Sequence, residues 1–302
     1  MRSCISKELR AAALAAALLF FALPAWGETI GALSPHHGVA GALIDRLYEQ
    51  LQAIVPHPRR VIVIGPDHFR RAKRNIVTGA SDWGTRKILR GDTEGAELSH
   101  LSRQDEVARR DHCITEHIPR IGKFFPGASV LSIIIKPAAT DLQVLRACQR
   151  LEALLREGDS VVILSMDLSH YKPREQSDAE DAKSLELISN FQLSKLNDAD
   201  IDCPRGARLF LMLMKRLGLT HATLLERSNS ADFIGSKLRG KEPPETPVGP
   251  SDSASTKRPA LCSDTADRHS AANLSVRVSW PSGRTTGHAT MLFTRPKDKG
   301  KD

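Results

Sequence analysis

The sequence predicts one α/β domain with a mixed, largely parallel central sheet flanked by helices. The first reason is a set of short runs rich in β-branched residues, such as residues 61–64 and 161–164. They are apolar throughout, as in strands buried on both faces of a sheet. The second reason is that amphipathic helical patterns alternate with these runs, so that strand-helix-strand units repeat. The third is size, because 302 residues with 41% hydrophobic content suffice for a globular core.

The individual elements follow from two kinds of spacing. Helices are expected where apolar residues recur three and four positions apart, as Ile44, Leu47 and Leu51 do; they are residues 38–55, 142–155, 177–194 and 207–217. Strands are expected at β-branched runs bounded by Gly, Pro or charged residues; they are residues 29–33, 60–64, 76–79, 130–135, 161–164, 221–225, 274–280 and 288–293. The last two are expected to form a terminal antiparallel pair.

Two segments are expected to lie outside this core. Residues 1–27 predict a secretory signal peptide, with a basic start, an apolar run at 11–23 and a small-x-small cleavage site at 25–27. The apolar run is shorter than the roughly 20 residues that span a bilayer, so a membrane anchor is the weaker interpretation. The mature domain is therefore expected at residues 28–302, periplasmic or secreted. Residues 240–273, rich in Pro, Ser and Thr, predict a disordered polar insertion.

Charge and cysteine content exclude some functions. Without residues 1–27 the chain has 40 Lys and Arg against 34 Asp and Glu, and its few aromatics predict no nucleic-acid surface. The basic cluster at 70–74 is interpreted as a solvated loop, with contact to anionic lipid or an acidic substrate as the alternative. The cysteines lack zinc-knuckle or Cys-x-x-Cys spacing, and their pairing is left open; they are Cys113, Cys148, Cys203 and Cys262.

Three predicted strands run directly into histidines. His36 follows the first of these strands, His68 the second, and Asp167 and His170 the third. Because such side chains cannot enter an apolar core without partners, we expect them at the carboxyl ends of the strands, where α/β sheets bind ligands. A carboxylate near an imidazole can fix its tautomer and leave the other nitrogen for a proton or a metal. The alternative is that Asp167 caps a helix beside a surface histidine.

A cysteine and a second histidine pair are also candidates. Cys203 precedes Pro204, which suits the first turn of a helix; the helix dipole would then lower the pKa of this thiol. A buried structural cysteine is the alternative. His112 and His117 are five positions apart and do not share a helical face, so we expect only one of them to face a site.

Taken together, these motifs resemble the Memo family, also called component B of the AmmeMemoRadiSam system. The match runs in register from about residue 30 to residue 235. The family's Pro-His-Ala-Gly-Tyr, Gly-Pro-Ser-His-His, Glu-His-Ser, Ser-Ser-Asp-x-x-His and Cys-Gly correspond to residues 35–39, 65–69, 111–113, 165–170 and 203–204. No single motif is specific, but the ordered set of five is.

The resemblance implies a fold like that of the LigB-type extradiol dioxygenases and a mononuclear, redox-active metal site. The implied ligands of the iron or copper ion are His36, His68 and Cys203. Two imidazoles and a thiolate suit such ions and leave positions open.

The resemblance also implies catalytic roles. His170 would be an acid/base group whose imidazole is held by Asp167, and His112 a second neutral donor. Five other histidines are interpreted as surface or structural residues; they are His37, His100, His221, His269 and His288.

Three functions are compatible with these features. The first is an exported metal-binding protein, whose partners are a metal ion or a small-molecule substrate. The second is a non-haem iron, extradiol-type dioxygenase acting on a small aromatic or related substrate. The third is a non-catalytic interaction protein. Fold resemblance alone does not choose among them.

Overall fold

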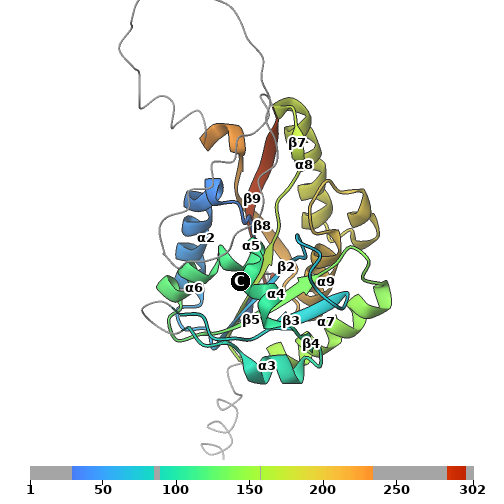
Figure 1. The fold of residues 1–302 in the computed structure, drawn as a ribbon. Helices are drawn as coiled ribbons and strands as arrows, with labels where there is room; N and C mark the ends of the chain where they lie inside the picture. Colours follow the sequence, from blue (N-terminus) through green and yellow to red (C-terminus); the bar gives the residue numbers. More distant parts are fainter. Residues whose placement is uncertain (1–28, 85–88, 157, 234–283, 297–302) are drawn as a thin grey trace, which may run out of the picture.

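The computed structural model describes residues 29–84, 89–156, 158–233 and 284–296 (Figure 1). The predicted signal peptide, the polar insertion and the expected strand at 274–280 lie outside these residues. Within the described part, no helix has the length and apolar character needed to cross a membrane.

The predicted fold class is confirmed: helices cover both faces of one mixed sheet (Figure 1). In the part of the chain that the structure describes, this sheet has the order β4-β3-β5-β2-β6-β1-β9-β7, and β8 also pairs with β9. Its strands are β1 (Thr29–Ser34), β2 (Arg60–Pro66), β3 (Ile76–Gly79), β4 (Ser102–Arg103), β5 (Ser129–Ile135), β6 (Ser160–Ser165), β7 (His170–Lys172), β8 (His221–Asn229) and β9 (Thr285–Thr294).

Most predicted helices are present with shifted ends. The expected helix at 177–194 begins and ends earlier, as α8, and the short α3 forms where the sequence patterns predict no helix. The helices are η1 (Gly38–Ala40), α2 (Gly41–Ile54), α3 (Thr93–Leu98), α4 (Asp105–Arg110), α5 (His112–Thr115), α6 (Ile118–Phe124), α7 (Asp141–Leu155), α8 (Arg174–Ser189), η2 (Leu193–Asp198) and α9 (Pro204–Arg216).

The centre of the sheet is the parallel set β5-β2-β6-β1. Side chains of these strands alternate between two apolar layers: Ile62 and Ile64 face one, whereas Val61 and Val63 face the other. Helices α7 and α9 close the first layer, and α2 and α6 close the second. This two-sided burial explains why the strands are apolar at every position.

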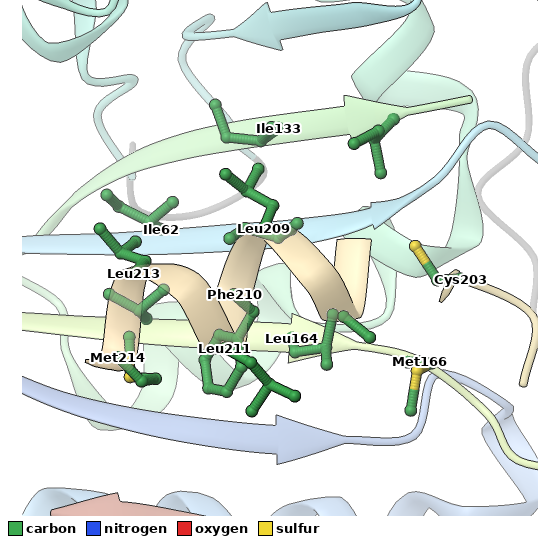
Figure 2. Close-up of a cluster of buried hydrophobic side chains, with 14 of the residues drawn as sticks. Ile62, Ile133, Leu164, Met166, Cys203, Leu209, Phe210, Leu211, Leu213 and Met214 are labelled. Carbon is green, nitrogen blue, oxygen red and sulfur yellow. The ribbon is translucent and has the colours of Figure 1, made fainter. Parts of the chain in front are cut away.

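Helix α9 packs directly on the sheet. Leu209, Phe210 and Leu213 are fully buried against the strands that carry Ile62 and Leu164 (Figure 2). Each such side chain contributes about 1.5–3 kcal/mol through removal of apolar surface from water. The helix begins at Pro204, whose missing N–H costs nothing at a first turn. Packing of α9 therefore fixes the position of the residues just before it, Asp202 and Cys203.

The strand order brings the predicted histidines to one edge. Strands β2, β6 and β1 are parallel neighbours, so the segments that follow them meet at the carboxyl edge of the sheet. Gly65 is required here, because a Cβ at this position would lie 2.4 Å from the Cys113 sulfur. On the other side of β1, antiparallel β9 brings His288 toward the same region, paired with Ser228 of β8.

Candidate metal centre

His36 is the most enclosed histidine that follows a predicted strand. It is 1% exposed, and its backbone N–H donates to an Asp167 carboxylate oxygen at 3.2 Å. Its Nδ1 lies 3.2 Å from the Ser165 hydroxyl at the end of β6. These contacts orient the ring so that Nε2 faces the carboxylate of Asp202, 3.1 Å from its Oδ2.

His68 is oriented in the same way by Asp111. The Asp111 carboxylate lies 2.7 Å from the His68 Nδ1 and accepts the His68 backbone N–H at 3.0 Å. The other ring nitrogen, Nε2, is 3.7 Å from the Asp202 Oδ2. Burial alone would lower the pKa of His68, but hydrogen bonds and charges of Asp111 and Asp202 raise it to about 9. The surroundings of His68 therefore stabilise positive charge.

His112 stacks on His68, with ring centroids 3.9 Å apart. Burial and then the positive charge of His68 lower the pKa of His112 to about 4, so this imidazole is neutral at pH 7. A neutral imidazole can donate its ring N–H, which the predicted role of His112 as a second neutral donor requires. The catalytic role of His112 stays a prediction.

Asp202 is the site residue that sequence reasoning missed. Its Oδ1 accepts the Asp167 backbone N–H at 3.2 Å, and its Oδ2 faces both His36 and His68. The Oδ2 of Asp202 and the Nε2 of His36 form an ion pair at 3.1 Å, and no further hydrogen bond to either buried atom is found among the described residues. Its position beside the cysteine motif was the only signal in the sequence.

Asp167 lies between this group and a second set of imidazoles. Its carboxylate contacts Nδ1 of His37 and lies 3.5 Å from Nε2 of His36. Burial favours the neutral acid, but the charge of His36 and the hydrogen bond with His37 hold the pKa of Asp167 far below its usual range. Its predicted partner His170 has a donor atom within 4.8 Å, in a group that also contains Asp202.

His37 and His288, expected to be surface or structural residues, lie in the same region. The ring centroid of His37 is 5.8 Å from that of His170 and 6.0 Å from that of His288. His288 is fully buried. Its lone position in strand β9 gave no signal, because only the sheet topology brings it near the first strand.

His117 is buried behind His36 and completes a hydrogen-bonded chain. Its Nδ1 lies 3.1 Å from the Tyr48 hydroxyl, and its Nε2 lies 3.1 Å from the Ser165 hydroxyl that also contacts His36. Burial lowers the pKa of His117 to about 3. As expected, only one of the pair His112 and His117 faces the open side of the site, where His112 is partly exposed.

The residues present fit a metal ion. Within the described residues, several donor groups have ligand atoms within 4.8 Å of one another, among them His36 with His68 and His112. Nε2 of His36 and Oδ2 of Asp202 lie 3.1 Å apart, and a metal ion that displaces the His36 proton could bind both atoms. Imidazole and carboxylate ligands suit iron, zinc and copper.

Comparison with known proteins decides the family. The family model described as Memo-like protein matches residues 11–239, more than half of the chain. The chain belongs to the Memo family. Its membership confirms the resemblance inferred from the five motifs.

The relatives in the Memo family are distant in sequence, but the alignments with this chain cover most of each relative's length. MEMO1 family proteins from Caldivirga maquilingensis and Ignicoccus hospitalis are 25% and 28% identical over 226 and 229 residues. These alignments cover 68% and 69% of this chain, and 78% and 79% of the relatives. The solved structure of an uncharacterized protein from Escherichia coli K12 aligns with a TM-score of 0.47 at 13% identity, over 66% of this chain and 93% of that one.

The Memo motif cysteine, Cys203, is buried immediately before helix α9. It is 3% exposed in the apolar layer under α9 (Figure 2), and none of the donor groups found within the described residues includes it. The expectation of a lowered thiol pKa is wrong: burial raises the pKa of Cys203 well above its usual value, and a hydrogen bond from the Gly206 backbone offsets this only in part. Its role as a ligand stays a prediction.

The described cysteines of the Memo domain are not paired in disulfides. Cys113, Cys148 and Cys203 are buried free thiols, and Cys262 lies outside the described residues. Cys113 donates to the Pro66 carbonyl at 3.3 Å. The three described thiols are therefore available to the domain in reduced form.

The basic cluster of this Memo protein lines an open hollow on the surface. The Asp67 carboxylate accepts the backbone N–H groups of Arg71 and Ala72, both at 3.0 Å, and so holds the segment in place. A cavity of about 950 Å³ lies alongside; its cationic lining residues are Arg71, Lys73, Arg74, Arg103 and Arg110. The segment is anchored at Asp67 while its cationic side chains face this open cavity.

Proposed function

We propose that this Memo family protein binds one redox-active metal ion between His36 and His68. The observation that carries the proposal is the meeting of three ligand atoms: Oδ2 of Asp202 lies 3.1 Å from Nε2 of His36 and 3.7 Å from Nε2 of His68. Asp202 is the third ligand that this geometry favours, and Cys203, from the family motif, is the alternative. Two histidines and one carboxylate suit iron(II) with open positions.

The electrostatics of the metal-free protein support a cation at this place. Burial lowers the pKa of His36, but Asp167 and Asp202 outweigh it, so the net shift is upward. His68 shifts in the same direction. Because the pKa values of both imidazoles are raised despite burial, their surroundings stabilise positive charge. A metal ion would displace these protons, so binding should weaken as pH falls.

The surrounding residues would orient the ligands. Asp111 holds the Nδ1 of His68, and Ser165 holds that of His36, which leaves both Nε2 atoms to face Asp202. Outer partners of this kind fix ring orientation and tautomer. When bound, a redox-active ion would supply electron transfer or Lewis-acid activation of a ligand.

A second candidate function is oxidation of a small substrate by an extradiol-type reaction. The observation that favours it is a set of proton-accepting groups beside the ligands: neutral His112 stacks on His68, and Asp167 with His170 belongs to an adjacent donor group. In this function His170 or His112 would move a proton to or from the substrate. Positioned acid/base groups typically contribute about 10²- to 10⁴-fold in rate.

Metal content tests the proposed function. The variant H36A/H68A should lose the ion at this position when purified protein is exposed to Fe²⁺ or Co²⁺, desalted and analysed for metal. The matched control is His221→Ala, which removes an exposed histidine of β8. Metal contents that do not differ between wild type and H36A/H68A would contradict the proposal.

The third ligand is tested in the same experiment. Asp202→Asn should bind Co²⁺ at least about tenfold more weakly than wild type, because loss of a ligand or of its outer partner commonly lowers metal affinity by this amount. Cys203→Ser should bind as wild type does. A near-ultraviolet thiolate-to-cobalt band that is lost in Cys203→Ser would instead assign the third ligand to Cys203.

A further inference from the structure

The cavity that the basic cluster lines continues into a second hollow. The first has a volume of about 950 Å³ and the second of about 400 Å³, and both are lined by Lys73, Arg74 and Ser102. They lie where β4 ends the sheet, near β3 and α4 (Figure 1). The second hollow also reaches helix α7, which supplies Arg146 and Arg150. The two hollows are therefore one continuous surface feature, the cationic groove.

The lining of the cationic groove is strongly positive. Arg146 and Arg150 add to the five cationic side chains of the first hollow, so seven Arg and Lys side chains line the groove. The carboxylates in the lining are those of Asp105 and Glu106. With histidine counted as neutral, the lining has a net charge of +5, and the whole chain has +8. More than half of the net charge of the protein is thus concentrated in one groove.

Both carboxylates in the groove already have partners. Asp105 accepts a hydrogen bond from Nη2 of Arg103 at 2.8 Å, and Glu106 lies 3.5 Å from Nε of Arg110. Five other cations have no ion-pair partner among the described residues; they are Arg71, Lys73, Arg74, Arg146 and Arg150. Such a group of like charges repels itself and attracts an anion.

Hydrogen bonds hold the backbone that carries these cations. The buried Asp67 carboxylate holds the start of the basic cluster, and Oε1 of Gln104 accepts the Lys73 backbone N–H at 2.9 Å. At the second hollow, the Arg150 guanidinium donates to the His100 carbonyl at 3.0 Å. A surface that is already ordered loses less conformational entropy when a ligand binds. This order distinguishes the groove from a freely solvated loop.

The shape and side chains of the groove restrict the class of ligand. The first hollow has a volume within the range of small-molecule sites, about 300–1,000 Å³. In the described part of the chain, no Phe, Tyr or Trp lines either hollow, so the bases of a single-stranded nucleic acid would have no stacking surface. None of the large exposed hydrophobic side chains lines it either, which leaves nothing to insert into a bilayer.

The charge of the groove favours phosphate over carboxylate groups. A phosphate monoester carries about −1.5 to −2 charges at pH 7, so about three such groups would balance the lining. A carboxylate ligand would need about five groups in the same space. Six of the seven cations are arginines, whose guanidinium groups bind phosphate through two parallel hydrogen bonds.

We propose that the cationic groove binds a soluble anion that carries two or more phosphate groups. This proposal goes beyond the proposed function, because it requires neither the metal ion nor the histidines.

Calorimetric titration of full-length protein with tripolyphosphate tests the proposal. Wild type should bind one equivalent, and R74Q/R146Q should bind at least about tenfold more weakly, because loss of a single charged hydrogen bond commonly has this effect. The matched control K195Q/K215Q removes the same charge from exposed lysines outside the groove. No measurable binding by wild type would overturn the proposal, and so would an equal loss of affinity in the two double variants.

A second control separates the groove from the metal centre, because polyphosphates also bind metal ions. H36A/H68A should bind tripolyphosphate as wild type does, and R74Q/R146Q should keep the metal content of wild type. Loss of tripolyphosphate binding in H36A/H68A, with unchanged binding in R74Q/R146Q, would move the phosphate groups to the metal centre and overturn the groove. Failure of the metal-content test alone would overturn only the proposed function.

Two further probes test the class of ligand. Tripolyphosphate should bind at least about tenfold more tightly than citrate, a tricarboxylate, at equal ionic strength. Vesicles of phosphatidylglycerol should not retain the protein in a sedimentation assay. Equal affinity for citrate would overturn the assignment to phosphate. Retention by vesicles that tripolyphosphate does not reverse would overturn the soluble ligand in favour of a membrane surface.

Discussion

Two buried histidines of this protein differ in the hydrogen-bond partners of their ring nitrogens. His117 and His288 are both 0% exposed, and burial lowers the pKa of both, to about 3 and about 4 respectively. His117 has a partner on each ring nitrogen, the hydroxyls of Tyr48 and Ser165. In the described part of the chain, His288 has none.

The hydrogen-bond partners of a buried polar group indicate whether its role is structural. The chain itself satisfies His117, so its contribution is to hold the ring of His36 through Ser165, and folding stability depends on it. No described residue pairs with the ring nitrogens of His288, and burial of an unpaired imidazole costs about 1–3 kcal/mol in the metal-free protein. At the proposed metal centre, the Nδ1 atoms of His36 and His68 have hydrogen-bond partners, whereas the Nε2 of His36 has ion-pair contacts with Asp167 and Asp202.

The largest effect expected from this comparison is on the stability of the metal-free protein. His117→Phe should lower the free energy of unfolding by about 2–4 kcal/mol, because it leaves the Tyr48 hydroxyl unpaired and breaks the chain to Ser165. Urea unfolding in the presence of chelator measures this. The control His221→Ala should stay within about 0.5 kcal/mol of wild type. A similarly small change in His117→Phe would remove the distinction between the two histidines.

Lowering the pH should destabilise wild type more than His288→Phe. The folded-state pKa of His288 is lowered from 6.5 to about 4, so its contribution to stability is complete above pH 6.5 and is lost as pH falls toward 4. At about 1.4 kcal/mol per unit, wild type should lose on the order of 3 kcal/mol more than His288→Phe across this window. Unfolding curves of both metal-free proteins at pH 7 and pH 4 give this difference directly. Parallel losses in the two proteins would show that His288 finds a partner in solution.

The smallest effect is expected for His288→Phe at pH 7 without metal. Because this change removes two unpaired polar atoms and keeps a ring of similar size, the free energy of unfolding should change by less than about 1 kcal/mol, toward higher stability if at all. Thermal unfolding of chelated protein compares it with His117→Phe. Destabilisation of His288→Phe as large as that of His117→Phe would mean that both imidazoles are structural.

Much of the fold could be predicted because its signals are local. Continuous apolar runs such as β2 and β6 report burial on both faces, and they end where polar residues begin. The order of parallel strands then brings His36 and His68 together without further information. The carboxyl-edge location of the site was therefore contained in the sequence.

The remaining site residues depend on contacts that no local pattern encodes. Asp202 was overlooked beside the more conspicuous Cys203, and which of the two faces the histidines is decided by how α9 packs on the sheet. His37 was interpreted as a surface or structural residue, although its ring lies 5.7 Å from that of His36. His288 reaches His37 only through the pairing of β9 with β1, across nearly the whole length of the chain.

The position of β9 also bears on when the site can form. Gly31 of β1 pairs with Phe293, so this edge of β1 stays unpaired until residue 293 has been synthesised. His36 and His68 emerge from the ribosome early, whereas His288 arrives late and in the strand that closes the sheet. Assembly of the full histidine cluster is therefore a late step in biogenesis, coupled to completion of the sheet.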